Sequence, residues 1–115
     1  MAMHMARAGM PLKAVVSFHG TLNVEASTKP GSIMAKILVC TGSDDPMMPP
    51  EKVMAFEDEM QRAGADWTVI TYGGTRHAFT NPAADTKGLP ALQYNAPADR
   101  RSWAAMRDFL AEVFA

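Results

Sequence analysis

The stretch AKILVCTGSDDPMMPP (residues 35–50) sets the fold class of this chain. Its first part, residues 35–40, is a short run of apolar and β-branched residues, which predicts a strand buried on both faces. Two adjacent acids follow, Asp44 and Asp45, and then prolines that suit the first turn of a helix. A buried strand that leads through polar residues into a helix is typical of a parallel sheet with helices packed against it.

The neighbouring segments continue this alternation. Residues 13–18 (KAVVSF) and 66–72 (DWTVITY) predict two further strands. Residues 50–63 carry apolar side chains at helical spacing, and Gly64 is placed to end that helix. Strands therefore alternate with helices along the chain.

The N-terminal residues 1–8 predict a short helix that ends near Gly9. Four of the ten methionines fall among the first ten residues, at Met1, Met3, Met5 and Met10. Methionine fills irregular apolar gaps, so we expect this segment to be buried.

Two irregular stretches connect these elements. Residues 19–34 predict a loop, and residues 78–95 predict a longer one, of the kind that is often functional. Asn95 is placed as the N-cap of a last helix. We expect Trp67 and Trp103 to be core aromatics. The apolar stripe expected on the last helix consists of Trp103, Met106, Leu110 and Val113.

Residues 1–115 are therefore expected to form a single three-layer α/β domain, with about three parallel strands and flanking helices. In such sheets chemistry collects beyond the carboxyl ends of the strands. His19, the Asp44–Asp45 pair and His77 each follow a predicted strand, so this edge is the candidate site.

Composition excludes several classes of function. The formal net charge is −1, and no basic patch with aromatic residues predicts nucleic-acid binding. Neither a membrane-spanning run nor a signal peptide is expected. The single cysteine, Cys40, forms no intrachain disulfide and fits a reducing cytoplasm. His4, His19 and His77 lack metal-ligand spacing, so no metal or other cofactor is expected.

An acid and a histidine on neighbouring strand ends are two members of a nucleophilic triad. Histidine carries a proton either way near neutral pH, and an acid bound to its second ring nitrogen fixes its tautomer. Asp44 or Asp45 together with His77 could supply this pair. The alternative is structural: the acids cap the following helix and His77 is an ordinary loop residue.

The third member, the nucleophile, has no clear candidate. Cys40 closes an apolar strand, where cysteines are mostly inert. Ser17 lies in VVSFHG, outside any G-x-S-x-G nucleophile elbow. His19 is interpreted as a packing or loop residue.

Several stretches resemble the C-terminal half of the dienelactone hydrolase family, which has the α/β-hydrolase fold. The resemblance covers nearly the whole chain and includes a G-x-x-D-x-x-x-P motif around the acid and an H-x-F motif around the histidine. The matching stretches are ARAGMPLKAVVSFHG, KILVCTGSDDPMMPPEKVMAFEDEMQRAGADW, YGGTRHAFTNP and YNAPADRRSWAAMRDFLAEVF.

The resemblance implies roles for individual residues. The acid of the motif precedes proline by four positions, which selects Asp45 with Pro49 rather than Asp44, and the histidine corresponds to His77. The family's cysteine or serine elbow has no counterpart, because the helix that follows it is matched by residues 1–9. We expect the chain to start about one helical turn after the elbow and to lack the upstream half, with its oxyanion-hole amide.

Two functions follow as hypotheses. The first is an ester or lactone hydrolase that is inactive as this chain alone and needs an N-terminal half from a second polypeptide or an upstream start. The second is a non-catalytic half-fold, either a homo-oligomer or a binding module. We also expect a homo-oligomer, a dimer, through the N-terminal helix and the strand at residues 13–18, because the resemblance implies that this strand has lost its neighbour. Strand pairing across a two-fold axis would give a continuous six-stranded sheet, and helix-on-helix packing without strand pairing is the alternative.

Overall fold

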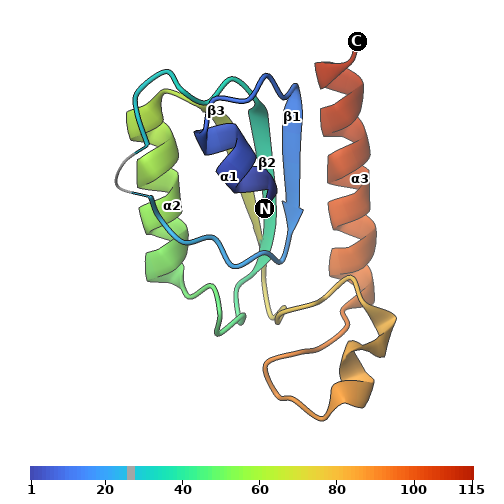
Figure 1. Ribbon diagram of the computed structural model, residues 1–115. Helices are drawn as coiled ribbons and strands as arrows, with labels where there is room; N and C mark the ends of the chain where they lie inside the picture. The colour runs from blue at the N-terminus through green and yellow to red at the C-terminus, as the bar shows by residue number, and fades with distance from the viewer. Residues whose placement is uncertain (26–27) are drawn as a thin grey trace.

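The computed structural model describes residues 1–25 and 28–115 (Figure 1). The predicted strands and α-helices are confirmed closely, and a short 3-10 helix is added within residues 78–95, which were predicted as a loop. The elements are α1 (Ala2–Arg7), β1 (Ala14–Phe18), β2 (Lys36–Gly42), α2 (Pro50–Ala63), β3 (Asp66–Tyr72), the 3-10 helix η1 (Pro82–Lys87) and α3 (Ala96–Val113). Of the loop expected over residues 19–34, residues 26 and 27 lie outside the described part, and its described remainder holds no helix or strand.

The three strands form one parallel sheet, as predicted, and their order is β1-β2-β3. Val16 lies opposite Leu38, and Leu38 lies opposite Thr68. The central strand β2 is buried from Ile37 to Gly42, which agrees with its unbroken apolar sequence. The parallel order brings all three carboxyl ends to one edge.

Helices cover both faces of this sheet. Successive side chains of β2 point to opposite faces, so the strand packs against helices on each side. Ile37 and Val39 pack with α1 and α2, including Phe56 of α2. Leu38 and Cys40 pack on the other face with α3. Figure 1 shows α1 crossing in front of the strands, with α2 and α3 to either side. The result is the three-layer α/β architecture expected from the sequence.

Two helix ends follow their predicted chemistry. Gly64 ends α2 with a φ of 70°, a left-handed conformation that glycine adopts without strain. The Asn95 side chain accepts a hydrogen bond from the Ala98 amide at 3.0 Å, so Asn95 is the N-cap of α3.

Two predictions about burial are wrong in part. Met3 is buried, but Met1 is 95% exposed and Met10 is also exposed. Trp103 is 46% exposed, whereas Trp67 packs partly buried against the core. The face that α3 turns to the sheet is displaced from the expected stripe. Met106 belongs to both, and the half-exposed Trp103 still contacts β1, with its ring centroid 5.6 Å from that of Phe18. The face turned to the sheet consists of Ala98, Ser102, Ala105, Met106 and Phe109.

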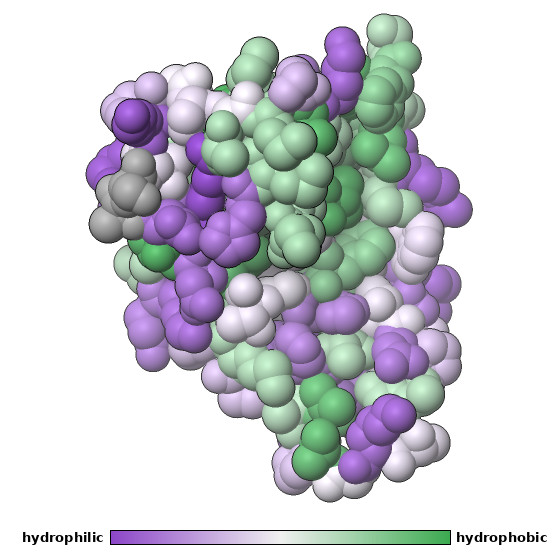
Figure 2. All heavy atoms as spheres, viewed as in Figure 1, coloured by the Kyte–Doolittle hydropathy of each residue, from purple (hydrophilic) through white to green (hydrophobic). Residues whose placement is uncertain are grey.

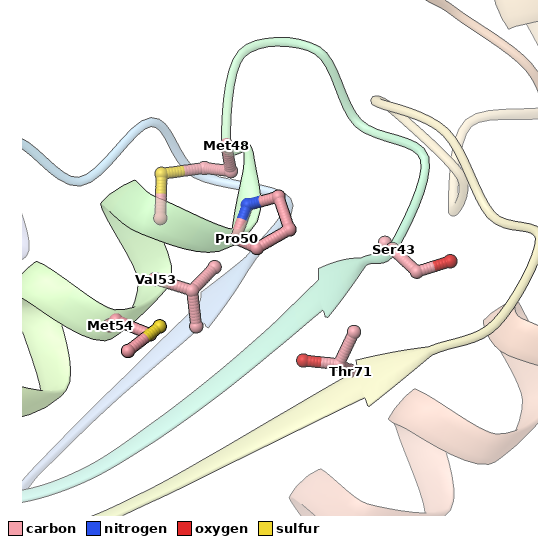
Figure 3. A pocket seen from close by; sticks show the side chains of 7 residues that line it. Ser43, Met48, Pro50, Val53, Met54 and Thr71 are labelled. Atoms are coloured by element: carbon pink, nitrogen blue, oxygen red, sulfur yellow. The ribbon is translucent and has the colours of Figure 1, made fainter.

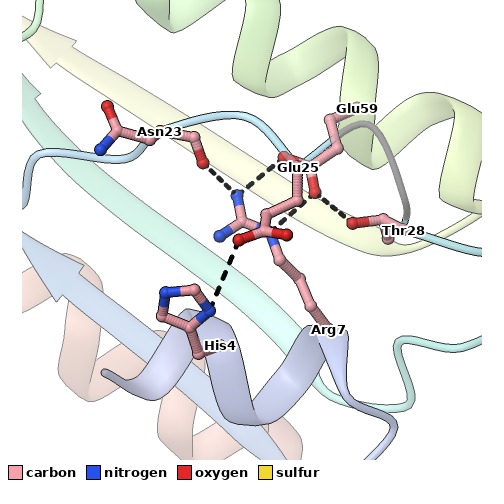
Figure 4. Close-up of polar contacts among 6 residues, drawn as sticks. All are labelled: His4, Arg7, Asn23, Glu25, Thr28 and Glu59. Atoms are coloured by element: carbon pink, nitrogen blue, oxygen red, sulfur yellow. Dashed lines mark hydrogen bonds and ion pairs between the residues drawn. The ribbon is translucent and has the colours of Figure 1, made fainter.

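A buried ion pair ties α1 to α2 (Figure 4). Arg7 donates from Nε and Nη2 to the two carboxylate oxygens of Glu59, each at 2.7 Å. Arg7 also donates to the Asn23 carbonyl at 2.8 Å, and the Thr28 hydroxyl donates to Glu59 at 2.7 Å. The Glu59 side chain has no exposed surface, so its charge depends on these donors.

The same contacts set the protonation of Glu59. Burial alone would raise the pKa of its carboxyl, but the hydrogen bonds from Arg7 and Thr28 outweigh burial and hold that pKa below the ordinary 4.5. A carboxyl with a depressed folded-state pKa contributes stability above its unfolded value. This contribution is lost as the pH falls from about 4.5 through the folded-state pKa.

We predict that Arg7→Met destabilises the chain by about 3–5 kcal/mol, because it leaves Glu59 buried without a countercharge. The matched control is Arg62→Met, which removes an exposed pair with Asp58 on α2 and should cost at most about 0.5 kcal/mol. Urea unfolding followed by circular dichroism measures both. Equal midpoints for the two variants would show that the buried pair adds nothing to stability.

Candidate functional site

The candidate site lies where the three strands end. Hydrogen bonds hold the segments that follow β2 and β3 together: the Ser43 amide donates to the Tyr72 carbonyl, and the Asp44 amide donates to the Thr75 carbonyl, both at 2.9 Å. Gly42 permits this approach, because a Cβ at that position would lie 2.2 Å from the Thr75 carbonyl oxygen. This contact brings the acid segment against the histidine segment.

Asp45 is buried, with 2% of its surface exposed, and both carboxylate oxygens are bonded. Oδ1 accepts from the Met47 amide at 2.8 Å, a local turn that fixes the side chain. Oδ2 lies 2.8 Å from Nδ1 of His77. The predicted contact between Asp45 and His77 is therefore present.

The fold also fixes the backbone around His77. Its amide donates to the Ala91 carbonyl at 3.0 Å, and its carbonyl accepts from the Gln93 amide at 3.1 Å. The residue after it, Ala78, has a φ of 58°, which is uncommon for a residue other than glycine. The loop predicted over residues 78–95 thus holds the histidine in place.

The hydrogen bond to Asp45 defines the tautomer of His77. A carboxylate only accepts hydrogen bonds, so Nδ1 carries the proton of this bond, and Nε2 has a free lone pair whenever the ring is neutral. The imidazole is 18% exposed, while the Asp45 side chain is fully covered. A neutral imidazole oriented by a buried acid has the geometry of a general base.

The other sequence candidates lie apart from this pair. Asp44 is exposed and accepts only from the neighbouring Ser43 hydroxyl, at 3.2 Å. Cys40 is buried, and burial raises the pKa of its thiol. Burial and the neighbouring Cys40 raise the pKa of Tyr72 to about 12. In the described residues, no serine or cysteine side chain is hydrogen-bonded to His77.

His19, interpreted from sequence as a packing or loop residue, joins the site. Its ring centroid lies 5.5 Å from that of His77. Burial, reinforced by the nearby His77, lowers the pKa of His19 below the ordinary 6.5. The only sequence signal for this placement is that His19 directly follows a strand.

A small cavity of about 180 Å³ adjoins the acid segment. Figure 3 shows Met48, from the segment before α2, and Val53 and Met54, from the first turns of α2, opposite Thr71 of β3. Its lining is mainly apolar, with room for a small alkyl group.

Within residues 1–25 and 28–115, no group of three or more histidine, cysteine or acidic side chains is placed to hold a metal ion. Every helix in this part of the chain is too short or too polar to cross a membrane.

Known proteins share this architecture. The sequence model of the dienelactone hydrolase family matches residues 1–114. The crystal structure of a dienelactone hydrolase-like promiscuous phosphotriesterase, P91 from metagenomic libraries, is 42% identical, with a TM-score of 0.91 over 96% of this chain. A structure named m3DLH is 40% identical, with a TM-score of 0.90 over 99% of this chain.

A relative in Caenorhabditis elegans, the uncharacterized protein K02A2.1, is 35% identical over 105 residues, which are 90% of this chain. The present chain spans 66% of that protein, 46% of P91 and 48% of m3DLH. The fold therefore corresponds to about half of the two solved structures.

We predict that Gly42→Ala destabilises the chain by about 1–3 kcal/mol or more, because the added methyl group collides with the Thr75 carbonyl. The control is Gly73→Ala, where a methyl group would meet no atom within 4 Å and which should change stability by at most about 0.5 kcal/mol. Urea unfolding gives the stabilities, and imidazole NMR shows whether His77 stays bound to Asp45. A Gly42→Ala variant as stable as Gly73→Ala, with the His77 signals unchanged, would contradict the role given to this contact.

Proposed function

The chain belongs to the dienelactone hydrolase family, and from that premise we propose that Asp45 and His77 are the acid and base of a site that hydrolyses carboxylic esters or lactones. The observation that carries the proposal is the 2.8 Å contact between a fully covered carboxylate and a partly open imidazole. An exposed pair would be screened by water and would orient the ring only weakly.

The chemistry follows from the free Nε2 of His77. This nitrogen removes the proton from a hydroxyl or thiol nucleophile as that group attacks the ester carbonyl, and an oxyanion forms. The proton then passes from Nε2 to the departing alkoxide, which leaves as an alcohol. Water repeats the sequence on the acyl group and releases the acid. Asp45 stabilises the imidazolium through Nδ1 in both half-reactions.

We place the nucleophile and the oxyanion-hole donors outside this chain. Two observations support this placement. No described serine or cysteine side chain is bonded to His77, and P91, which has a closely similar fold, is about twice as long. A nucleophile, a base and an oxyanion hole act as a unit, so the chain alone should show almost no turnover.

The sharpest test joins this chain to the part of P91 that it does not match. We predict that the chimera hydrolyses nitrophenyl acetate and that His77→Ala or Asp45→Asn lowers kcat by about 10²–10⁴-fold. The matched control is Asp44→Asn, an exposed neighbouring acid whose replacement should leave kcat unchanged. Equal losses in Asp44→Asn and Asp45→Asn would contradict the assignment.

The unfused chain tests where the nucleophile lies. Turnover by this chain alone that disappears in His77→Ala would contradict a nucleophile supplied from outside. Ser17→Ala and Cys40→Ala variants would then identify the internal group.

A second candidate function, a non-catalytic homodimer, is favoured by the open edge of β1. The Lys13 carbonyl accepts a hydrogen bond from the Lys36 amide, and the His19 amide donates to the Cys40 carbonyl. Odd-numbered residues from 13 to 19 therefore turn their backbone N–H and C=O groups toward β2. Ala14, Val16 and Phe18 therefore turn theirs outward, where the described residues add no further strand to the sheet. An unpaired edge of this kind invites another strand.

The surface along this edge carries apolar side chains among polar groups. A groove of about 380 Å³ runs along β1 and is lined by α1, β1 and residues 20–22. Figure 2 shows apolar atoms over this region that continue onto the C-terminal end of α3. Covering a few hundred Å² of the apolar part of this surface would contribute several kcal/mol at about 25 cal/mol per Å². Two copies related by a two-fold axis would cover it and extend the sheet to six strands.

We predict a dimer with twice the 12.4 kDa chain mass by light scattering at micromolar concentration. Val16→Pro removes one outward amide and keeps the ladder to β2, and Thr21→Lys adds a charge to the groove; both should give monomers. Met34→Lys is the control, because Met34 is 65% exposed and does not line the groove. Self-association would be contradicted if the wild-type chain is a folded monomer. It would also be contradicted if the chain pairs with the unmatched half of P91 and not with itself.

A further inference from the structure

His19 is held at the end of β1 by a strained backbone and a long-range hydrogen bond. Its φ of 44° places it in the left-handed region, which costs a residue other than glycine about 1 kcal/mol. Its amide donates to the Cys40 carbonyl at 2.9 Å and so continues the ladder to β2. This left-handed backbone conformation sets the direction of the His19 side chain at the end of β1.

The imidazole of His19 is wedged between two rings of the site. It meets His77 nearly edge-on, at 72°, and meets Phe79 at 78° with the centroids 5.2 Å apart. Its Nε2 lies 2.8 Å from the hydroxyl oxygen of Thr80, so the ring cannot turn without losing that bond. His19 therefore forms one wall against which His77 rests.

The charge on His19 matters because His77 must accept a proton in the proposed reaction. Burial and the proximity of His77 lower the pKa of His19, and these effects exceed the opposing influences of its own backbone and Asp45. The ring is neutral near pH 7 and does not repel a protonated His77. An arginine or lysine at this position would carry a positive charge and would repel a protonated His77.

We infer that His19 is a positioning residue that, with Thr80, fixes the ring plane of His77 so that Nδ1 stays on Asp45. The terminal torsion of a histidine is broad, so one hydrogen bond alone leaves the ring room to turn. The edge contact with His19 removes that freedom, and the Thr80 bond prevents His19 from moving away. This inference rests on the proposed function, because a fixed ring serves His77 as a base.

The test reads the His77 ring directly, by nitrogen-15 NMR of the unfused chain at pH 7.5. In the wild type we expect a single Nδ1–H tautomer. In His19→Ala and in Thr80→Val, the Nε2–H tautomer should rise from undetectable to a measurable share of His77. Thr80→Ser keeps the hydroxyl and should restore the wild-type signals.

Two controls separate positioning from packing. His4→Ala removes a 70% exposed imidazole on α1 and should leave His77 unchanged. His19→Phe keeps an aromatic ring against His77 but cannot bond to Thr80. This variant fills the core even if His19→Ala unfolds. It should give the same mixed tautomers of His77 as Thr80→Val. Unchanged His77 signals in folded His19→Phe and Thr80→Val would overturn the inference.

This readout requires no turnover. If the chimera is inactive while the tautomer responds as expected, the proposed function fails and the positioning role stands. If the chimera is active and the tautomer does not respond, only the positioning role fails.

Discussion

Burial of β2 on both faces is the constraint on which the rest of the structure depends. A strand covered by helices on each side needs an apolar side chain at nearly every position, and β2 has one from Ile37 to Cys40. Crossover connections between successive strands place helices on the faces of the sheet, and such connections join parallel strands. Parallel strands end at one edge, and that edge gathers His19, Asp45 and His77. The position of the candidate site therefore follows from how the core is covered.

Most of the architecture was predictable from the sequence, because its signals are local. The β-branched runs, the Gly64 stop and the Asn95 cap each act within a few residues of themselves, and all three predictions were confirmed. The choice of Asp45 over Asp44 came from the spacing to Pro49 in a recognised motif, and the structure places Asp45 against His77. Periodicity alone would have left both acids open.

The features that escaped prediction depend on residues far apart in the chain. His19 meets Thr80 across 61 positions, and Arg7 meets Glu59 across 52. Neither pair has a local signature, since a histidine after a strand and charges on a helix usually face solvent. The misplaced Trp103 has a different cause. Helical spacing gives the width of an apolar face but not its direction, and α3 is rotated so that Ala98, Met106 and Phe109 pack in the core while Trp103 contacts only its rim at Phe18.

The ion pair between α1 and α2 has a consequence for the order in which the molecule opens. With six residues, α1 is too short to persist as a helix by itself, so its hydrogen bonds depend on packing and on Arg7. Terminal helices commonly fray at little cost. Here, unwinding α1 would leave the buried Glu59 carboxylate without its Arg7 countercharge, so we expect the amide hydrogens of α1 to exchange with solvent mainly when α2 also opens. The N-terminal segment would then belong to the same cooperative unit as the centre of the domain.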